Sequence, residues 1–84
     1  MAGHDPADVE RRLRAGERVT VPELAAVFER DRTTVYRWVV KRKLIKSRMS
    51  PGGGEVEIEP EDALRALANW RAGRPLDAEP DREA

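Results

Sequence analysis

The chain has 84 residues, a formal net charge of zero from 16 basic and 16 acidic side chains, and no cysteine. This length predicts one small domain whose core is too modest for a buried catalytic cavity, and the lack of cysteine excludes disulfides and thiolate zinc sites. No apolar run approaches the ~20 residues that cross a bilayer, and no signal-peptide apolar segment follows the start, so we expect a cytoplasmic protein.

Residues 1–18 predict a leader followed by a short helix. Asp5 is an N-cap, Pro6 a first-turn proline and Gly16 a C-terminal stop, which together indicate a helix over residues 6–15. We expect this helix to pack at the periphery, because its apolar residues are chiefly Val9 and Leu13. Residues 18–20 are expected to be extended.

Two short helices are predicted over residues 21–42, joined by a turn of about three residues. Thr20 and Glu23 have the T-x-x-E spacing of a capping box for the first helix, and Asp31 can cap the second. The residues expected to face inward from the first helix are Leu24, Ala25, Val27 and Phe28. Two capped helices joined by a short turn form the helix-turn-helix pattern.

The second of these helices separates by face. Val35, Trp38 and Val39 fall together at i, i+3 and i+4 and predict a buried side. The opposite side carries Thr33, Tyr36, Arg37, Val40 and Lys41. An amphipathic helix with a basic outer face, presented by a capped partner helix, is suited to a DNA major groove.

Basic residues are concentrated in one region although the net charge is zero. Residues 30–48 contain a single acid, Asp31, and the following bases: Arg30, Arg32, Arg37, Lys41, Arg42, Lys43, Lys46 and Arg48. Because the rest of the chain is acidic, the molecule should have a large dipole that orients an approaching polyanion.

A hairpin is predicted after the second helix, with strands over residues 45–50 and 55–59. Pro51 and three glycines, Gly52, Gly53 and Gly54, form its turn and lack the Lys-Ser/Thr sequence of a P-loop. The second strand alternates two apolar residues, Val56 and Ile58, with three acids, Glu55, Glu57 and Glu59. We interpret the acidic row as a solvated strand face rather than a cation site.

Pro60, Glu61 and Asp62 begin a last helix, which Gly73 ends. The predicted inward stripe of this helix is Leu64, Leu67 and Ala68. Trp70 lies on its flank, and we interpret it as a core residue, with a self-association surface as the alternative. Residues 74–84 are rich in proline and acids and predict a disordered acidic tail.

Four segments carry a resemblance to a known family: residues 19–25 (VTVPELA), residues 31–39 (DRTTVYRWV), Leu44, and residues 58–64 (IEPEDAL). With this order and spacing the chain resembles the excisionase family and, more broadly, the MerR-like winged helix-turn-helix domains. The resemblance implies a mainly α fold with a small β-hairpin wing, which occupies residues 19–73. In excisionases this domain binds beside recombination sites and bends DNA for an integrase, and in related regulators it binds promoters.

The chain departs from the family pattern at three places. The turn is Glu29-Arg30-Asp31 where the family has Gly-hydrophobic-Ser, and Arg42-Lys43 follow the second helix where the family has glycine. The acids after the hairpin glycines would repel phosphate. We therefore expect wing contacts to come from Lys46, Ser47, Arg48 and the backbone of the glycine turn.

Ten side chains and the three turn glycines form the predicted DNA-contacting set. Arg37 is expected to reach a guanine edge and Lys41 a phosphate or base, whereas base and phosphate roles remain open for Arg32 and Thr33. Tyr36 is assigned to a phosphate or a thymine methyl group. Val40 has two open interpretations, a thymine methyl contact and partial burial against the wing. The set is Arg30, Arg32, Thr33, Tyr36, Arg37, Val40, Lys41, Lys43, Lys46 and Arg48, with Gly52, Gly53 and Gly54.

Catalysis is not expected, since the chain has one histidine, His4 in the leader, and no cysteine. No metal, cofactor, membrane or small-molecule ligand is expected either. The predicted function is sequence-specific binding of double-stranded DNA as a phage or plasmid excisionase, which binds cooperatively through self-association on DNA, bends attachment-site DNA and has an integrase or recombinase as partner. Two alternatives remain open: a small MerR-like transcriptional regulator, and a protein-interaction module that has lost DNA binding.

Overall fold

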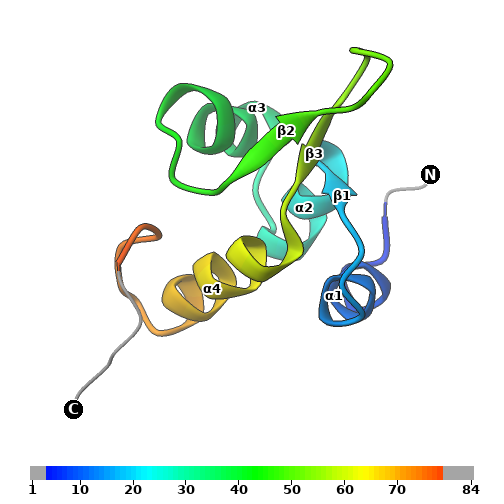
Figure 1. Cartoon of the computed structure of the whole chain (residues 1–84). Coiled ribbons are helices and arrows are strands. Elements are labelled where there is room, and N and C mark those ends of the chain that lie inside the picture. Colours follow the sequence, from blue (N-terminus) through cyan, green and yellow to red (C-terminus); the bar gives the residue numbers. More distant parts are fainter. Residues whose placement is uncertain (1–3, 79–84) are drawn as a thin grey trace.

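The computed structural model, which describes residues 4–78, is mainly helical and in that part contains four α-helices, a π-helical turn and a three-stranded antiparallel sheet (Figure 1). In chain order the elements are α1 (Pro6–Arg14), β1 (Val19–Thr20), α2 (Val21–Phe28), α3 (Arg32–Tyr36), the π-helical turn η1 (Arg37–Lys41), β2 (Ser47–Met49), β3 (Val56–Ile58) and α4 (Pro60–Arg71). No helix in residues 4–78 is long and apolar enough to cross a membrane.

The predicted starts of α1, α2 and α3 are confirmed by their capping bonds, and α4 begins at Pro60 as predicted, without a side-chain capping bond. The Asp5 carboxylate accepts a hydrogen bond from the N–H of Ala7 at 3.1 Å. At α2 the capping box is complete, because the Glu23 N–H donates to Thr20 Oγ1 at 3.5 Å and the Thr20 N–H donates to Glu23 Oε1 at 2.9 Å. Asp31 accepts from the Thr34 N–H at 2.9 Å. Each start depends on residues at most three positions apart, which sequence spacing can show.

The sheet has the strand order β1-β3-β2 and therefore joins the hairpin to the first third of the chain. Val19 lies opposite Ile58 on one side of β3, and Ser47 lies opposite the same Ile58 on the other. The extended segment predicted at residues 18–20 is thus a paired strand. Both hairpin strands are shorter than predicted, because regular pairing begins at Ser47 and is limited to three residues of each strand.

The short first helix contributes to the core, in contrast to the expected peripheral packing. Val9 and Leu13 are each 1% exposed and belong to the same apolar cluster as Leu24, Val35 and Ile58. Because α1 packs against both α2 and α4, two apolar side chains one turn apart are enough to bury its inner face.

The inward face of α4 differs from the predicted stripe. Leu67 is buried as expected, but Leu64 is only partly buried and Ala68 is exposed, while the buried residues are Ala63, Ala66, Leu67 and Asn69. The helix is turned so that the Asn69 amide donates to the carbonyl oxygens of Leu76 and Ala78, each at 3.1 Å.

Residues 74–78 differ from the predicted disordered tail. Leu76 is 8% exposed and joins the core, and the Arg65 guanidinium donates to its carbonyl oxygen at 2.7 Å. The burial of Leu76 therefore orders a segment whose polar composition predicted disorder. The other residues of the predicted tail, 79–84, lie outside the described residues, as do residues 1–3 of the leader.

Candidate nucleic-acid interface

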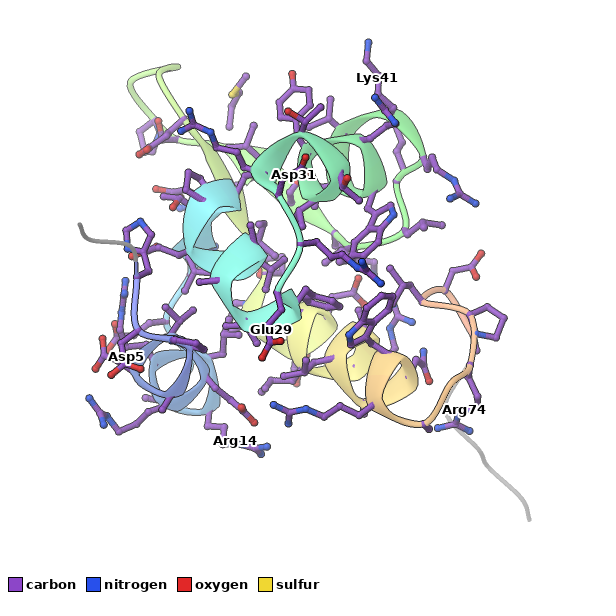
Figure 2. The ribbon with its side chains drawn as sticks, turned by 180° about the vertical axis from the view of Figure 1, so that it is seen from behind. Asp5, Arg14, Glu29, Asp31, Lys41 and Arg74 are labelled. Carbon is purple, nitrogen blue, oxygen red and sulfur yellow. The ribbon has the colours of Figure 1, made fainter. Side chains whose placement is uncertain are left out.

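The helix formed by α3 and η1 presents a polar, basic face to solvent. Val35 and Val39 are buried, whereas Arg32, Thr33, Arg37 and Lys41 are exposed. Tyr36 on this face is 45% exposed although it is a large aromatic residue. Figure 2 shows Lys41 pointing outward on the opposite side of the molecule from Arg14 and Arg74. The predicted separation of faces is confirmed for these residues.

Three aromatic rings hold the inner side of this helix. The ring of Trp38 lies 5.5 Å from that of Phe28 and 5.4 Å from that of Trp70, and the rings of Phe28 and Trp70 are 5.8 Å apart. Each ring comes from a different element (α2, η1 and α4), so the cluster fixes the orientation of the exposed face. Both tryptophans are partly buried against the core, which agrees with their interpretation as core residues.

The second half of the helix is wider than an α-helix. The N–H of Arg42 donates to the carbonyl oxygen of Arg37, five residues earlier, at 2.9 Å. Just after η1, the N–H of Leu44 donates to the carbonyl oxygen of Trp38, six residues earlier, at 2.8 Å. Such π-helical turns are rare and are found frequently at functional sites. The i, i+3, i+4 pattern did not reveal this turn, since Val35 and Val39 are buried on either side of its start.

Arg30 is separated from the other candidate residues. Its guanidinium carbon lies 5.0 Å from the centroid of the Trp70 ring, a cation–π arrangement that directs the side chain toward α4. The structure therefore does not bring Arg30 together with Arg37 and Lys41. Its partner is 40 positions away in sequence, so no local pattern could have shown this contact.

Val40 is partly buried and packs against the core. It lies beside Met49 and Val56 in an open groove of about 1000 Å³ between η1, β2 and the start of α4. Its burial is thus against the core, with hairpin residues across the groove, and both interpretations of Val40 stay predictions.

The basic residues that follow η1 are exposed but differ in their partners. Lys43 and Lys46 line the groove and form no salt bridge within residues 4–78. Arg48 lies opposite Glu57 in the β2–β3 ladder, and its Nε donates to Glu57 Oε1 at 3.2 Å. This exposed pair leaves less of the Arg48 charge for a ligand than the sequence suggests.

The acidic row of β3 is partly neutralised by arginines. Glu57 pairs with Arg48, and Glu59 pairs with Arg18 at 3.2 Å, while Glu55 is exposed at the hairpin. In residues 4–78 no group of three or more acidic or histidine side chains is placed to hold a metal ion. The predicted repulsion of phosphate by this row is therefore weakened by ion pairs with Arg48 of β2 and with Arg18, the residue before β1.

The glycine turn is organised by Ser50, which the sequence did not single out. Its hydroxyl oxygen accepts hydrogen bonds from the N–H groups of Gly54 and Glu55 at 3.3 and 3.2 Å, and its carbonyl oxygen accepts from Gly53 at 2.7 Å. The amides of Gly53 and Gly54, expected to be donors to DNA, are thus used within the hairpin.

Met49 is a second residue that the sequence did not indicate. It is 61% exposed, and with Tyr36 it is one of two large apolar side chains that residues 4–78 expose. The register places it opposite Val56, on the side of the hairpin that lines the groove. Only the strand pairing shows this position, since residues 47–49 have no alternation of apolar and polar residues.

The backbone of Lys46 joins the groove to α4. Its N–H donates to Asp62 Oδ2 at 2.7 Å, and the Arg65 Nε donates to Asp62 Oδ1 at 2.9 Å. Burial is the largest single effect on Asp62 and raises its pKa, but the hydrogen bonds from Arg65 and Lys46 outweigh it, so the pKa of Asp62 is lowered. An ionised Asp62 therefore holds the segment between η1 and β2 in place.

Comparisons of the chain with protein-family models, with curated proteins and with solved structures find no match.

Proposed function

We propose that this chain binds double-stranded DNA as a winged helix-turn-helix domain. In this proposal α2 and the α3–η1 helix form the helix-turn-helix, the α3–η1 face enters the major groove, and the β2–β3 hairpin is the wing that lies along the backbone. The exposed residues Arg32, Thr33, Tyr36, Arg37 and Lys41 would contact DNA from the helix, and Lys43, Lys46 and Arg48 from the segment that follows.

The observation that carries this proposal is the distribution of salt bridges. Most arginines of α1, the sheet and α4 pair with acids of the same domain, as in Arg12–Glu23 at 2.7 Å and Arg71–Glu10 at 2.8 Å. Within residues 4–78 no salt bridge is formed by Arg32, Arg37, Lys41, Arg42, Lys43 or Lys46. Arg30 and Arg74 also lack a salt bridge in this part of the chain, but Arg30 lies over Trp70 and Arg74 lies on the opposite side of the molecule from Lys41. The other six cations form a positive region centred on an exposed helix, and a polyanion is its natural partner.

A double substitution tests the proposed recognition surface. Replacing Arg37 and Lys41 with alanine should weaken binding to duplex DNA by at least about tenfold, because a base-edge contact contributes roughly 1–3 kcal/mol and a phosphate contact adds to it. Fluorescence anisotropy with a labelled duplex from the region that flanks the gene would measure the change, and circular dichroism would check that the helices remain.

The matched control removes the same charge from the other side of the molecule. Arg14 and Arg74 are exposed and lie opposite Lys41 (Figure 2), so replacing both with alanine should leave DNA affinity within about threefold of the original. Equal losses in the two double variants would contradict the proposed surface. If the unaltered protein shows no salt-sensitive binding to any duplex, DNA binding itself is contradicted and the protein-interaction module becomes the better explanation.

Within this proposal the biological role is that of an excisionase, with the transcriptional regulator as the alternative. Both roles rest on the family resemblance, and the choice of DNA separates them. Cooperative, laddered complexes on attachment-site DNA support the excisionase, because one small domain makes few base contacts and needs further copies for useful specificity. Binding confined to a promoter fragment supports the regulator.

A further inference from the structure

A single guanidinium group joins the end of the described chain to the segment that follows η1. Arg65 Nη1 donates to the carbonyl oxygen of Ala78 at 3.1 Å, and Arg65 Nη2 donates to that of Leu44 at 3.1 Å. Because both nitrogens belong to one planar group, the chain at residue 78 lies beside Leu44. Figure 1 shows the orange end of the described chain on the same side of the molecule as the loop between η1 and β2.

The position of this chain end is held by more than one contact. Leu76 is buried in the core, and Asn69, 2% exposed, donates from Nδ2 to the carbonyl oxygens of Leu76 and Ala78. The Ala78 N–H also donates to the carbonyl oxygen of Pro75 at 3.1 Å. The described chain therefore ends at a defined point beside the segment that follows the proposed recognition helix.

The residues around Leu44 are basic, whereas those that follow Ala78 are mainly acidic. Lys41, Arg42, Lys43 and Lys46 are exposed around Leu44 and form no salt bridge with residues 4–78. The six residues that follow Ala78 contain three acids, Glu79, Asp81 and Glu83, and one base, Arg82. An extended chain covers up to about 3.3–3.6 Å per residue, so this segment can span the four cations.

We propose that residues 79–84 bind the basic surface formed by Lys41, Arg42, Lys43 and Lys46 of the same molecule. Each exposed ion pair is weak, but the tether through Ala78 holds the acids at an effective concentration in the millimolar range. Lys41, Lys43 and Lys46 also belong to the proposed DNA-contacting set, so the segment competes with DNA for this surface. The competition rests on the proposed function, whereas the binding within the molecule does not.

Paramagnetic relaxation tests the intramolecular contact without DNA. The chain has no cysteine, so Ala84→Cys provides the single site for a nitroxide label on the 84-residue chain. At low salt the label should broaden the amide signals of residues 41–46 far more than those of α1. The same label in a chain that also carries Glu79→Gln, Asp81→Asn and Glu83→Gln should lose this broadening, as should the first protein at about 1 M salt. Equal broadening with and without the three acids overturns the proposal.

DNA affinity tests the competition with charge-matched variants. Glu79→Gln with Glu83→Gln should tighten binding to a duplex by about two- to fivefold, because the competing carboxylates are removed. The control, Glu17→Gln with Glu29→Gln, changes the net charge by the same amount at exposed sites that do not line the groove, and should change affinity by less than the tail variant. If both pairs tighten binding equally, general repulsion explains the effect and the competition is contradicted. If the unaltered protein binds no DNA, the proposed function is contradicted. The relaxation experiment would still test the contact within the molecule, because it contains no DNA.

Discussion

Glu29 and Lys43 adopt the left-handed backbone conformation that glycine adopts with least strain. Their φ angles are 56° and 55°, and they are the residues other than glycine with positive φ in the described part of the chain. Both stand where the resembled family has glycine, after α2 and after η1. Each of these residues carries a β-carbon in the left-handed conformation, which strains each by roughly 1–2 kcal/mol.

Placing glycine at the first of these positions should stabilise the protein. Glu29→Gly removes the β-carbon strain and loses part of that gain to the greater freedom of the unfolded chain, so we expect the free energy of unfolding to rise by about 0.5–1 kcal/mol. Urea unfolding followed by circular dichroism measures it. Glu29→Ala is the control, because it removes the carboxylate but keeps the β-carbon and should give no gain. A lower stability for the glycine variant would show that the left-handed residue is not strained.

The roles of single side chains were predictable only where their partners are close in sequence. Asp31 and Thr34 are three positions apart, and their capping bond could be predicted from spacing. Arg30 stacks on Trp70 and Arg65 reaches Leu44, Leu76 and Ala78, and such contacts depend on how distant elements are packed. The exposed face of Arg32, Arg37 and Lys41 could therefore be predicted from local spacing, but which charges are already engaged by a distant partner could not.

At the scale of elements, a bidentate salt bridge between Arg71 and Glu10 connects α4 to α1. Arg71 Nη1 and Nη2 donate to the two carboxylate oxygens of Glu10 at 3.0 and 2.8 Å, and Arg14 donates to the same carboxylate at 2.8 Å. The hydrogen bonds from Arg71, followed by that from Arg14, lower the pKa of Glu10 to about 2, against a smaller opposing effect of burial. The helix that sequence composition placed at the periphery is fastened to the last helix by this contact.

Acid should weaken this connection. Because the folded-state pKa of Glu10 lies below its ordinary value of 4.5, its contribution to stability is present above about pH 5 and is lost as the pH falls toward 2. We expect the unaltered protein to lose about 1 kcal/mol more between pH 6 and pH 2.5 than Glu10→Gln, since exposure to solvent reduces the full effect. Thermal unfolding across this pH range measures it, with Glu55→Gln as a control at an exposed site. Parallel pH profiles for the Glu10→Gln and unaltered proteins would contradict the assignment.

Local sequence patterns could not predict the elements whose position depends on pairing or packing with residues far away in the sequence. The strand β1 exists because Val19 and Thr20 pair with Ile58 and Glu57, and a two-residue segment has no periodicity of its own. The stripe of α4 was misplaced because the segment that ends at Ala78 packs on Asn69, a polar residue that the apolar pattern passes over. The caps, the turn glycines and the apolar faces of α2 and α3 carry their own signals, and these were predictable.

At the scale of the whole molecule, zero net charge hides an uneven distribution. Arg12, Arg14, Arg18 and Arg71 pair with acids at residues 10, 17, 23 and 59. Arg48 pairs with Glu57, but the cations of α3, of η1 and of residues 42–46 have no such partners among residues 4–78. The same surface adjoins Ala78, the last described residue. One positive surface would then serve both proposals, with the chain's own acids as the competitor of DNA.

The most direct test of the proposed DNA surface is a titration of isotope-labelled protein with a short duplex, followed by amide chemical shifts at low and high salt. We predict that the largest shifts lie at residues 32–46 and along the β2–β3 hairpin, and that they diminish as salt is raised. Signals of α1 and of the outer face of α4 should change little. Shifts concentrated on α1 and α4, or none at any salt concentration, would contradict the proposal that the α3–η1 face binds DNA.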